Sequence, residues 1–137
     1  MFPREGESVP RLRFPGFTTH WKQQNVEEIA DFRTGHVESR VGDVLLPNSG
    51  YSPDVVARTK CDIGGGVPHN GDVNIIRPHN GVNGSCLSLA LNRGNELIRF
   101  VQGSIGKRIP FVDVKDKVTV LLPKLEEQQK IPEFLMR

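Results

Sequence analysis

The chain has 137 residues, of which 36% are hydrophobic, 25% charged and 7% aromatic, with a formal net charge of +2. These values indicate one globular domain and exclude a disordered chain, while the small positive charge neither requires nor excludes a nucleic-acid partner. No apolar run approaches the roughly 20 residues of a membrane span, and the first residues lack the apolar stretch of a secretory signal. We therefore expect a cytoplasmic protein without a membrane partner.

The first 19 residues are rich in proline, glycine and charge, which predicts an extended lead-in to the domain. The hydrophobic side chains expected to anchor it are Leu12, Phe14, Phe17 and Trp21. Asn25 and Glu28 then have the spacing of a capping box, in which each side chain bonds the backbone amide of the other residue. This predicts a short helix to about Phe32, with Ile29 and Phe32 facing inward.

The middle of the chain alternates hydrophobic runs with turn residues. The pattern predicts strands at residues 41–46, after a turn, and 73–77, before Pro78, with a further candidate strand at 55–57. The glycine-rich residues 62–72 predict a flexible loop.

Residues 85–102 have the longest helical pattern in the chain. Their hydrophobic residues are too dense for a surface stripe, so most of this segment should be buried. The polar run 92–95 predicts two helices separated by a turn. A glycine-punctuated basic loop at 103–109 and a short strand or turn at 111–114 are expected to follow.

The end of the chain predicts a strand followed directly by a helix. Residues 117–122 are β-branched and apolar, and Pro123 ends the strand because proline has no amide donor. Helix-forming residues continue from Lys124, and Pro132 should stop or kink this helix. The chain is therefore predicted to be an α+β domain, compact and mixed, with short strands, a buried helical segment and the start of a C-terminal helix.

Motifs for catalysis and metal binding are almost absent. Cys61 and Cys86 are interpreted as two reduced thiols, a disulfide being the less favoured alternative, and the four histidines form no zinc motif. We predict no metal and no cofactor. Asp54 with Asp113 and Lys115 matches a nuclease constellation only weakly, because such triplets are common in surface turns.

Two loops carry side chains that suit contacts with DNA. Basic side chains with nearby free amides suit phosphates, and asparagine, serine and tyrosine side chains suit base edges. The candidates are Asn48, Ser49, Tyr51 and Arg58 in the first region and Ser104, Lys107 and Arg108 in the second. From the residues alone, ordinary surface loops explain the same pattern equally well.

Several stretches, in this order, resemble the specificity subunits of type I restriction-modification systems. They are RLRFPGFTTHWKQQNVEEIADFRTG near the start, VGDVLLPNSG in the middle, and GSIGKRI and VTVLLPKLEEQQKI near the end. The chain resembles one target-recognition half of such a subunit. The resemblance implies a non-catalytic target-recognition domain that reads part of a split DNA target, followed by a long helix.

The same resemblance implies the partners. They are double-stranded DNA, the methyltransferase, and a second copy of the chain or a full specificity subunit. The restriction subunits would bind through the methyltransferase. The helix residues expected to pack against a partner are Leu125, Phe134 and Leu135. The alternative function is a protein-interaction scaffold or half-subunit that binds the methyltransferase or another specificity subunit without reading DNA.

Two features depart from the family. The interval between Gly35 and Val41 is short where the family has strands and DNA-reading loops, and Pro132 stands where the family commonly has glycine. We therefore expect a target-recognition-like domain at residues 1–123, shortened near 35–42, and a truncated start of the spacer helix at 124–137. A half-subunit, a remnant whose DNA recognition is impaired by deletion, and a recombination cassette all stay open.

Overall fold

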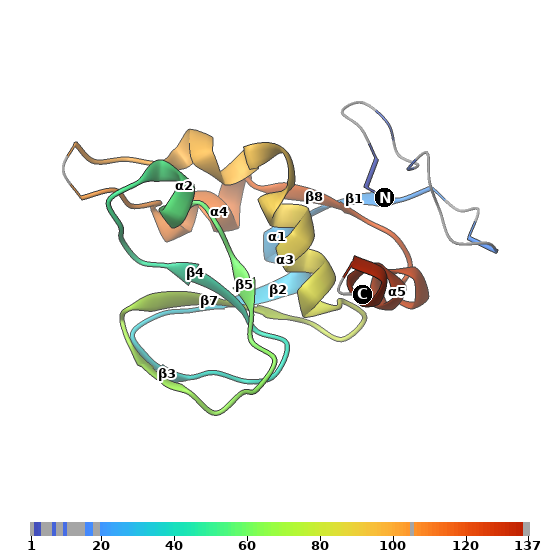
Figure 1. The fold of residues 1–137 in the computed structure, drawn as a ribbon, viewed down its shortest axis with the longest axis horizontal. Helices are drawn as coiled ribbons and strands as arrows, with labels where there is room; N and C mark the ends of the chain where they lie inside the picture. Colours follow the sequence, from blue (N-terminus) through green and yellow to red (C-terminus); the bar gives the residue numbers. More distant parts are fainter. Residues whose placement is uncertain are drawn as a thin grey trace.

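The computed structural model describes residues 2–3, 7, 10, 16–17, 20–104 and 106–135, without the side chains of residues 54, 94–96 and 133–135. Short antiparallel sheets and helices surround one hydrophobic core, which confirms the predicted α+β class (Figure 1). Among these residues, no helix has the length and apolar character needed to cross a membrane.

A four-stranded antiparallel sheet forms the centre of the fold. Its order is β2 (Ala30–Arg33), β7 (Val73–Pro78), β4 (Val44–Pro47) and β5 (Lys60–Cys61). The predicted strands around β4 and β7 are confirmed, and β7 ends at Pro78 as expected. Val44 lies opposite Ile76 in the register, and both side chains are fully buried beneath the helices. The sheet thus supplies one wall of the core.

Strand β2 replaces most of the helix predicted to reach Phe32. Helix α1 (Val26–Ile29) is a single turn, and Ala30–Arg33 pairs with β7 instead. Asn25 caps no helix amide, and its Nδ2 atom lies 3.5 Å from Oε1 of Glu28. Pairing along β7 gives this segment a full ladder of hydrogen bonds, which outweighs the local helix signal.

Strands β3 (His36–Glu38) and β6 (Pro68–Asn70) form a two-stranded extension beyond β2 and β7. The chain bends at Gly35 and Gly71, both with a φ of +82°, and the Gly71 amide donates to the Gly35 carbonyl over 3.0 Å. The prediction of a loop at 62–72 is therefore wrong for residues 68–70. The short interval near 35–42 contains the strand with which they pair.

Helices cover one side of the central sheet (Figure 1). Helix α3 (Gly84–Asn92) begins at Asn83, whose side chain accepts from the Cys86 amide over 2.9 Å. The 3-10 helix η1 (Arg93–Phe100) follows directly, so the two predicted helices are present, but the turn predicted between them at 92–95 is not. Helix α3 contacts β4, β5, β8 and α5, so it joins the sheet to the end of the chain.

Two predicted extended segments are helices in the structure. Helix α2 (Pro53–Val56) occupies the candidate strand at 55–57, and Pro53 suits its first turn because the missing amide has no helical partner there. Helix α4 (Phe111–Lys117) replaces the strand or turn predicted at 111–114. An ion pair of 3.3 Å between Asp113 and Lys117 supports α4 at the i,i+4 spacing.

The predicted junction at the end of the chain is confirmed. Strand β8 (Thr119–Leu122) pairs with β1 (Lys22–Asn25), and helix α5 (Leu125–Leu135) begins after Pro123. Of the expected stop or kink at Pro132, the stop is wrong, because α5 continues to Leu135. Ile131 and Pro132 are both buried, and this burial offsets the backbone hydrogen bond that proline lacks.

The aromatic anchors near the start of the chain behave as predicted where they are described. Trp21 is buried, with its ring edge-to-face against Phe2 at 5.5 Å between centroids. Phe17 lies beneath the Lys130 ammonium, 5.5 Å from the ring centroid. Leu12 and Phe14 lie outside the described residues.

Candidate functional site

The two loops with the predicted DNA contacts meet at one end of the molecule. Gly50 and Lys107 exchange backbone hydrogen bonds of 2.9 and 2.7 Å, and Gln102 and Arg108 exchange bonds of 2.8 and 2.9 Å. We call residues 48–51, 102–104 and 106–108 the paired tip. It lies at the left of Figure 1, at the far end from β1 and α5.

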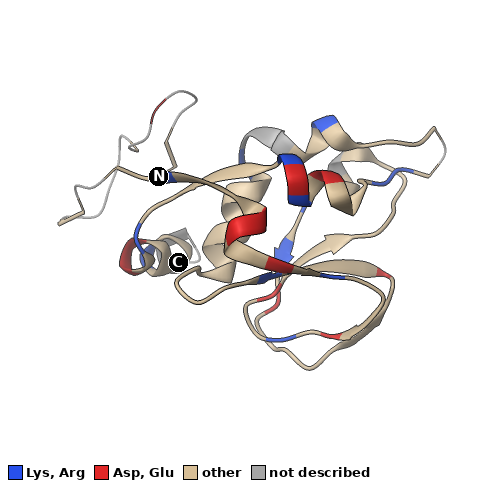
Figure 2. Ribbon diagram, turned by 180° about the vertical axis from the view of Figure 1, so that it is seen from behind, with Lys and Arg blue, Asp and Glu red and all other residues tan. Residues whose placement is uncertain are grey.

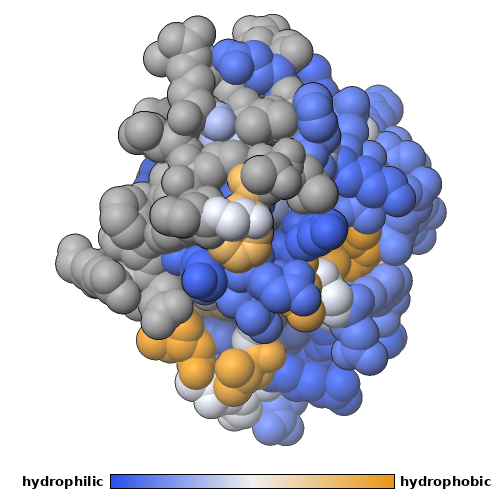
Figure 3. Space-filling view, turned by 90° about the vertical axis from the view of Figure 1, so that its right-hand side faces the viewer, coloured by the Kyte–Doolittle hydropathy of each residue, from blue (hydrophilic) through white to orange (hydrophobic). Residues whose placement is uncertain are grey.

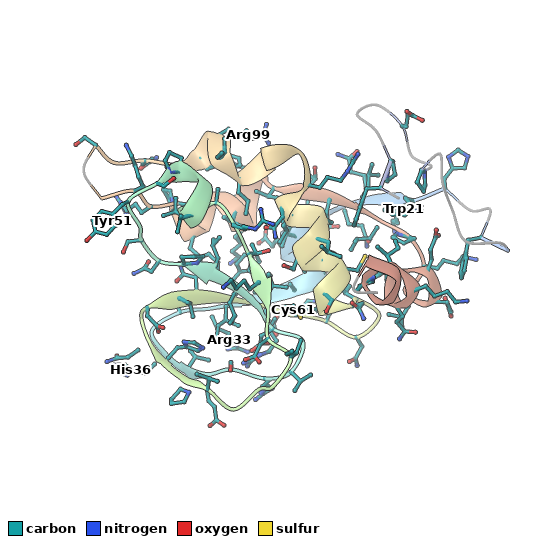
Figure 4. All side chains as sticks on the ribbon, in the orientation of Figure 1. Trp21, Arg33, His36, Tyr51, Cys61 and Arg99 are labelled. Atoms are coloured by element: carbon teal, nitrogen blue, oxygen red, sulfur yellow. The ribbon has the colours of Figure 1, made fainter. Side chains whose placement is uncertain are left out.

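Most side chains of the paired tip are open to solvent. Tyr51 is 92% exposed, which is unusual for a large aromatic residue, and Figure 4 shows it projecting away from the core. The other exposed side chains are Asn48, Ser49, Gln102, Ser104 and Arg108. The cations of this loop are visible at the right of Figure 2. The paired tip therefore combines polar, aromatic and basic groups on one small surface.

Lys107 also has a structural contact that the sequence did not indicate. Its Nζ atom donates to the Gly103 carbonyl over 2.6 Å and its side chain is half-buried. Gly103 has a φ of +106°, and a Cβ atom there would lie 2.0 Å from the Gly106 carbonyl oxygen. Only glycine suits this turn. Because an ammonium has three donors, Lys107 retains two for a phosphate while it closes the loop.

Helix α2 packs against the paired tip. A Cβ atom at Gly50 would lie 2.8 Å from Cγ1 of the buried Val56, so the loop approaches the helix too closely for a side chain at residue 50. Arg58 is exposed just beyond α2, and its amide bonds the Val55 carbonyl at 3.4 Å. Arg58 thus follows the supporting helix and is not part of the paired tip itself.

A neighbouring turn borders the paired tip, and sequence reasoning missed it. The Asn48 amide donates to the Asp72 carbonyl over 3.1 Å, one step beyond the last β4–β7 pair of Pro47 and Val73. Asp72 also accepts from Nδ1 of His69, at 3.1 and 3.2 Å to its two carboxylate oxygens. The only sequence signal was a polar run between two strands.

The opposite end of the fold holds the predicted partner-binding residues. Leu125 is half-buried and lines a groove of about 540 Å³ between β1, the loop 79–82 and α5. The side chains of Phe134 and Leu135 lie outside the described part of the structure. Along α5, Glu127, Gln128 and Ile131 are buried against the domain. One face of this helix is therefore already occupied.

Gln128 fixes α5 to the domain through three hydrogen bonds. Its Oε1 accepts from the Asn83 amide over 2.8 Å, while its Nε2 donates to the carbonyls of Pro123 at 2.9 Å and Gly81 at 3.3 Å. The side chain is only 3% exposed. These contacts tie the start of α5 to the residue that caps α3.

Within the described residues, no group of three or more His, Cys, Asp or Glu side chains could hold a metal ion. Of the weak nuclease constellation, Asp113 pairs with Lys117, and the Asp54 side chain lies outside the described part. Both cysteines are free thiols, as predicted. Burial raises the pKa of Cys86 to about 12, so this thiol stays protonated and is no nucleophile at neutral pH.

Comparisons with known proteins identify the fold. No family model matches the chain, and no curated protein matches it in sequence. The crystal structure of a type I restriction-modification S subunit from M. genitalium matches 90% of the chain with a TM-score of 0.68 and 10% identity. That of the HsdS subunit from Thermoanaerobacter tengcongensis matches 93% with a TM-score of 0.61 and 18% identity.

The chain spans 39% of the length of each of these two S subunits. At such low identity the match concerns the fold, and the fold is the one that the sequence resemblance implied. The matched part includes nearly the whole chain, so its overall fold is shared with these S subunits.

Proposed function

We propose that the chain is a non-catalytic DNA-recognition module of a type I restriction-modification system, and that the paired tip binds double-stranded DNA. The observation that carries this proposal is the exchange of backbone hydrogen bonds between Gly50 and Lys107. It joins a polar loop and a basic loop, which are distant in sequence, into one exposed surface. The shared fold of the S subunits supports the same assignment.

The chemistry of the paired tip divides into two roles. Lys107, Arg108 and the amides near Ser104 neutralise and position phosphates, which fixes the orientation of the protein on the duplex. Asn48, Ser49 and Tyr51 supply donors, acceptors and an exposed ring for the groove. Arg58, beyond α2, adds a further phosphate contact. The net charge of the whole chain is only +2, so attraction of DNA depends on where the cations lie and not on their total number.

Helix α5 is proposed as the start of the helix that connects the recognition domain, at residues 1–123, to partner subunits. Its inner face is occupied by the domain, while Glu126, Gln129 and Lys130 are exposed on its outer face. The partners proposed for that surface are the methyltransferase, with the restriction subunits bound through it, and a second specificity chain.

A protein-interaction scaffold is the second candidate, and one observation favours it. Val41, Ile63 and Val67 are 70%, 77% and 48% exposed on two loops that adjoin through backbone bonds. Figure 3 shows hydrophobic side chains gathered near the lower edge of an otherwise mostly hydrophilic face. Exposed apolar groups of this kind suit a protein partner.

A duplex-binding titration at several salt concentrations separates the two candidates. A DNA-recognition module binds random-sequence duplex with an affinity that falls as salt rises, because bound cations release counterions from the phosphates. A scaffold that does not read DNA is retained by the cognate methyltransferase yet shows no salt-dependent duplex binding. Absence of binding at low salt would contradict the proposed function.

A further inference from the structure

The turn beside the paired tip presents one carboxylate to solvent. The Asp72 side chain is 63% exposed, and its backbone carbonyl is bonded to the Asn48 amide over 3.1 Å. Figure 4 shows Tyr51 and His36 projecting from the same side of the molecule, above and below this turn. The turn that carries this carboxylate therefore borders the surface that the proposed function assigns to DNA.

Two donors hold this carboxylate in a fixed position. Nδ1 of His69 lies 3.1 and 3.2 Å from its two oxygens, and the Asn70 amide donates to Oδ1 over 3.1 Å. The His69 side chain is only 10% exposed, and β6 positions it through the register pair with Val37. Ordering of an acceptor before binding removes the entropic cost that a free surface side chain would incur.

The same contacts keep Asp72 ionised. The hydrogen bond from His69 lowers the pKa of Asp72 below its ordinary value, so at neutral pH the group is a pure acceptor. An ionised carboxylate near DNA is repelled by phosphates. Such a group is compatible with a DNA-binding face where it accepts a hydrogen bond from a base.

We propose that Asp72, positioned by His69, is a specificity-determining residue that accepts a hydrogen bond from the exocyclic amino group of a cytosine in the major groove. This inference rests on the proposed function, because it requires the paired tip to face DNA. Cytosine is the natural partner of a carboxylate, since adenine places its N7 acceptor beside its amino group and guanine offers only acceptors in that groove. His69 acts as a positioning residue and does not touch the base.

The test is selection from a duplex pool with a randomised central segment, performed with the full chain. The wild type is expected to enrich cytosine at one position on the order of tenfold over the other bases. Asp72→Asn and Asp72→Ala should lose this preference while they retain the salt dependence of binding. Asp116→Asn, which neutralises an exposed carboxylate on α4, should leave the preference unchanged.

The His69→Gln variant separates positioning from folding. It should weaken the cytosine preference without altering the salt dependence, a pattern that general loss of structure does not produce. Unchanged base selection in Asp72→Asn, or a preference that depends on Asp72 for a base other than cytosine, would overturn the inference alone. Failure of the wild type to bind any duplex would overturn both this inference and the proposed function.

Discussion

Gly50 and Lys107 face each other across two backbone hydrogen bonds of 2.9 and 2.7 Å, and through them two distant loops become one surface. Gly50 also needs to be glycine, because Val56 lies directly behind it. The pairing of Gly50 with Lys107 uses backbone atoms and depends on the shape of the loops, not on side-chain charge. It follows that changes in loop shape should affect DNA binding even where every charge is retained.

Gly103→Ala tests loop shape without loss of charge. A Cβ atom at Gly103 would lie 2.0 Å from the Gly106 carbonyl oxygen at a φ of +106°, so the turn has to change. We expect duplex affinity to fall on the order of tenfold, because Lys107 is displaced from Gly50 and Arg108 from Gln102. Gly106→Ala is the matched control, since nothing lies within 4 Å of its Cβ position. Equal affinities for the two variants would contradict a role for this turn.

Gln128→Ala tests how α5 is attached to the domain. The change leaves the Asn83 amide without its acceptor and removes a buried side chain, so the free energy of unfolding should fall by about 1–3 kcal/mol. Chemical denaturation measures this difference. Gln129→Ala, its exposed neighbour on the same helix, should change stability by less than about 0.5 kcal/mol.

Gly84→Ala tests the contact between the start of α3 and the turn before β4. A Cβ atom at Gly84 would lie 1.9 Å from the Gly42 carbonyl oxygen. Separating the two segments should lower the free energy of unfolding by about 1–3 kcal/mol or more. Gly64→Ala has open space around its Cβ position and serves as control in the same denaturation experiment. Similar stabilities would show that this contact is not needed.

The two cysteines should differ in reactivity between the folded and the denatured protein. Burial raises the pKa of Cys86 from 9.0 to about 12, so at pH 8 its thiolate fraction is on the order of one in ten thousand. A thiol reagent should leave Cys86 unmodified in the folded protein and label it after denaturation, as mass spectrometry can follow. Burial also raises the pKa of the half-buried Cys61. In the Cys61→Ser variant Cys86 is the remaining thiol. The folded variant should therefore show no reactive thiol.

The raised pKa of Cys86 also makes the stability of the fold depend on pH. Between about pH 9 and 12 the unfolded chain releases the Cys86 proton while the folded chain retains it, so stability should fall as pH rises. A Cys86→Ala variant lacks this contribution and should show a shallower decline over that range. Parallel declines would contradict the assignment.

The sequence predicted those parts of the fold that local signals decide. Pro123, followed by helix-forming residues, marks the junction of β8 and α5, and the polar run at 92–95 divides α3 from η1. Helix α4 was missed because Phe111, Val112 and Val114 suit a strand equally well by local pattern. Val114 is buried in the core, and only the tertiary structure determines this contact.

The candidate site was predictable in its residue types and not in its geometry. Lysine and arginine in a glycine-rich loop, and asparagine and serine after a strand, suit contacts with DNA, although ordinary surface loops have the same composition. The pairing of Gly50 with Lys107 and the position of Asp72 beside Asn48 depend on the register of strands that are remote in sequence. No local pattern specifies that register.

The most direct test of the account is the salt dependence of duplex affinity for the Lys107→Gln, Arg108→Gln double variant. Glutamine retains a donor for the Gly103 carbonyl while both charges are removed. The control is Lys22→Gln with Lys124→Gln, which removes two exposed cations at the far end of the fold (Figure 1). We predict weaker binding and a slope of log affinity against log salt that is reduced by about two for the first pair, with no change for the second. Equal slopes for both variants and the wild type would contradict the assignment of the paired tip as the DNA-binding surface.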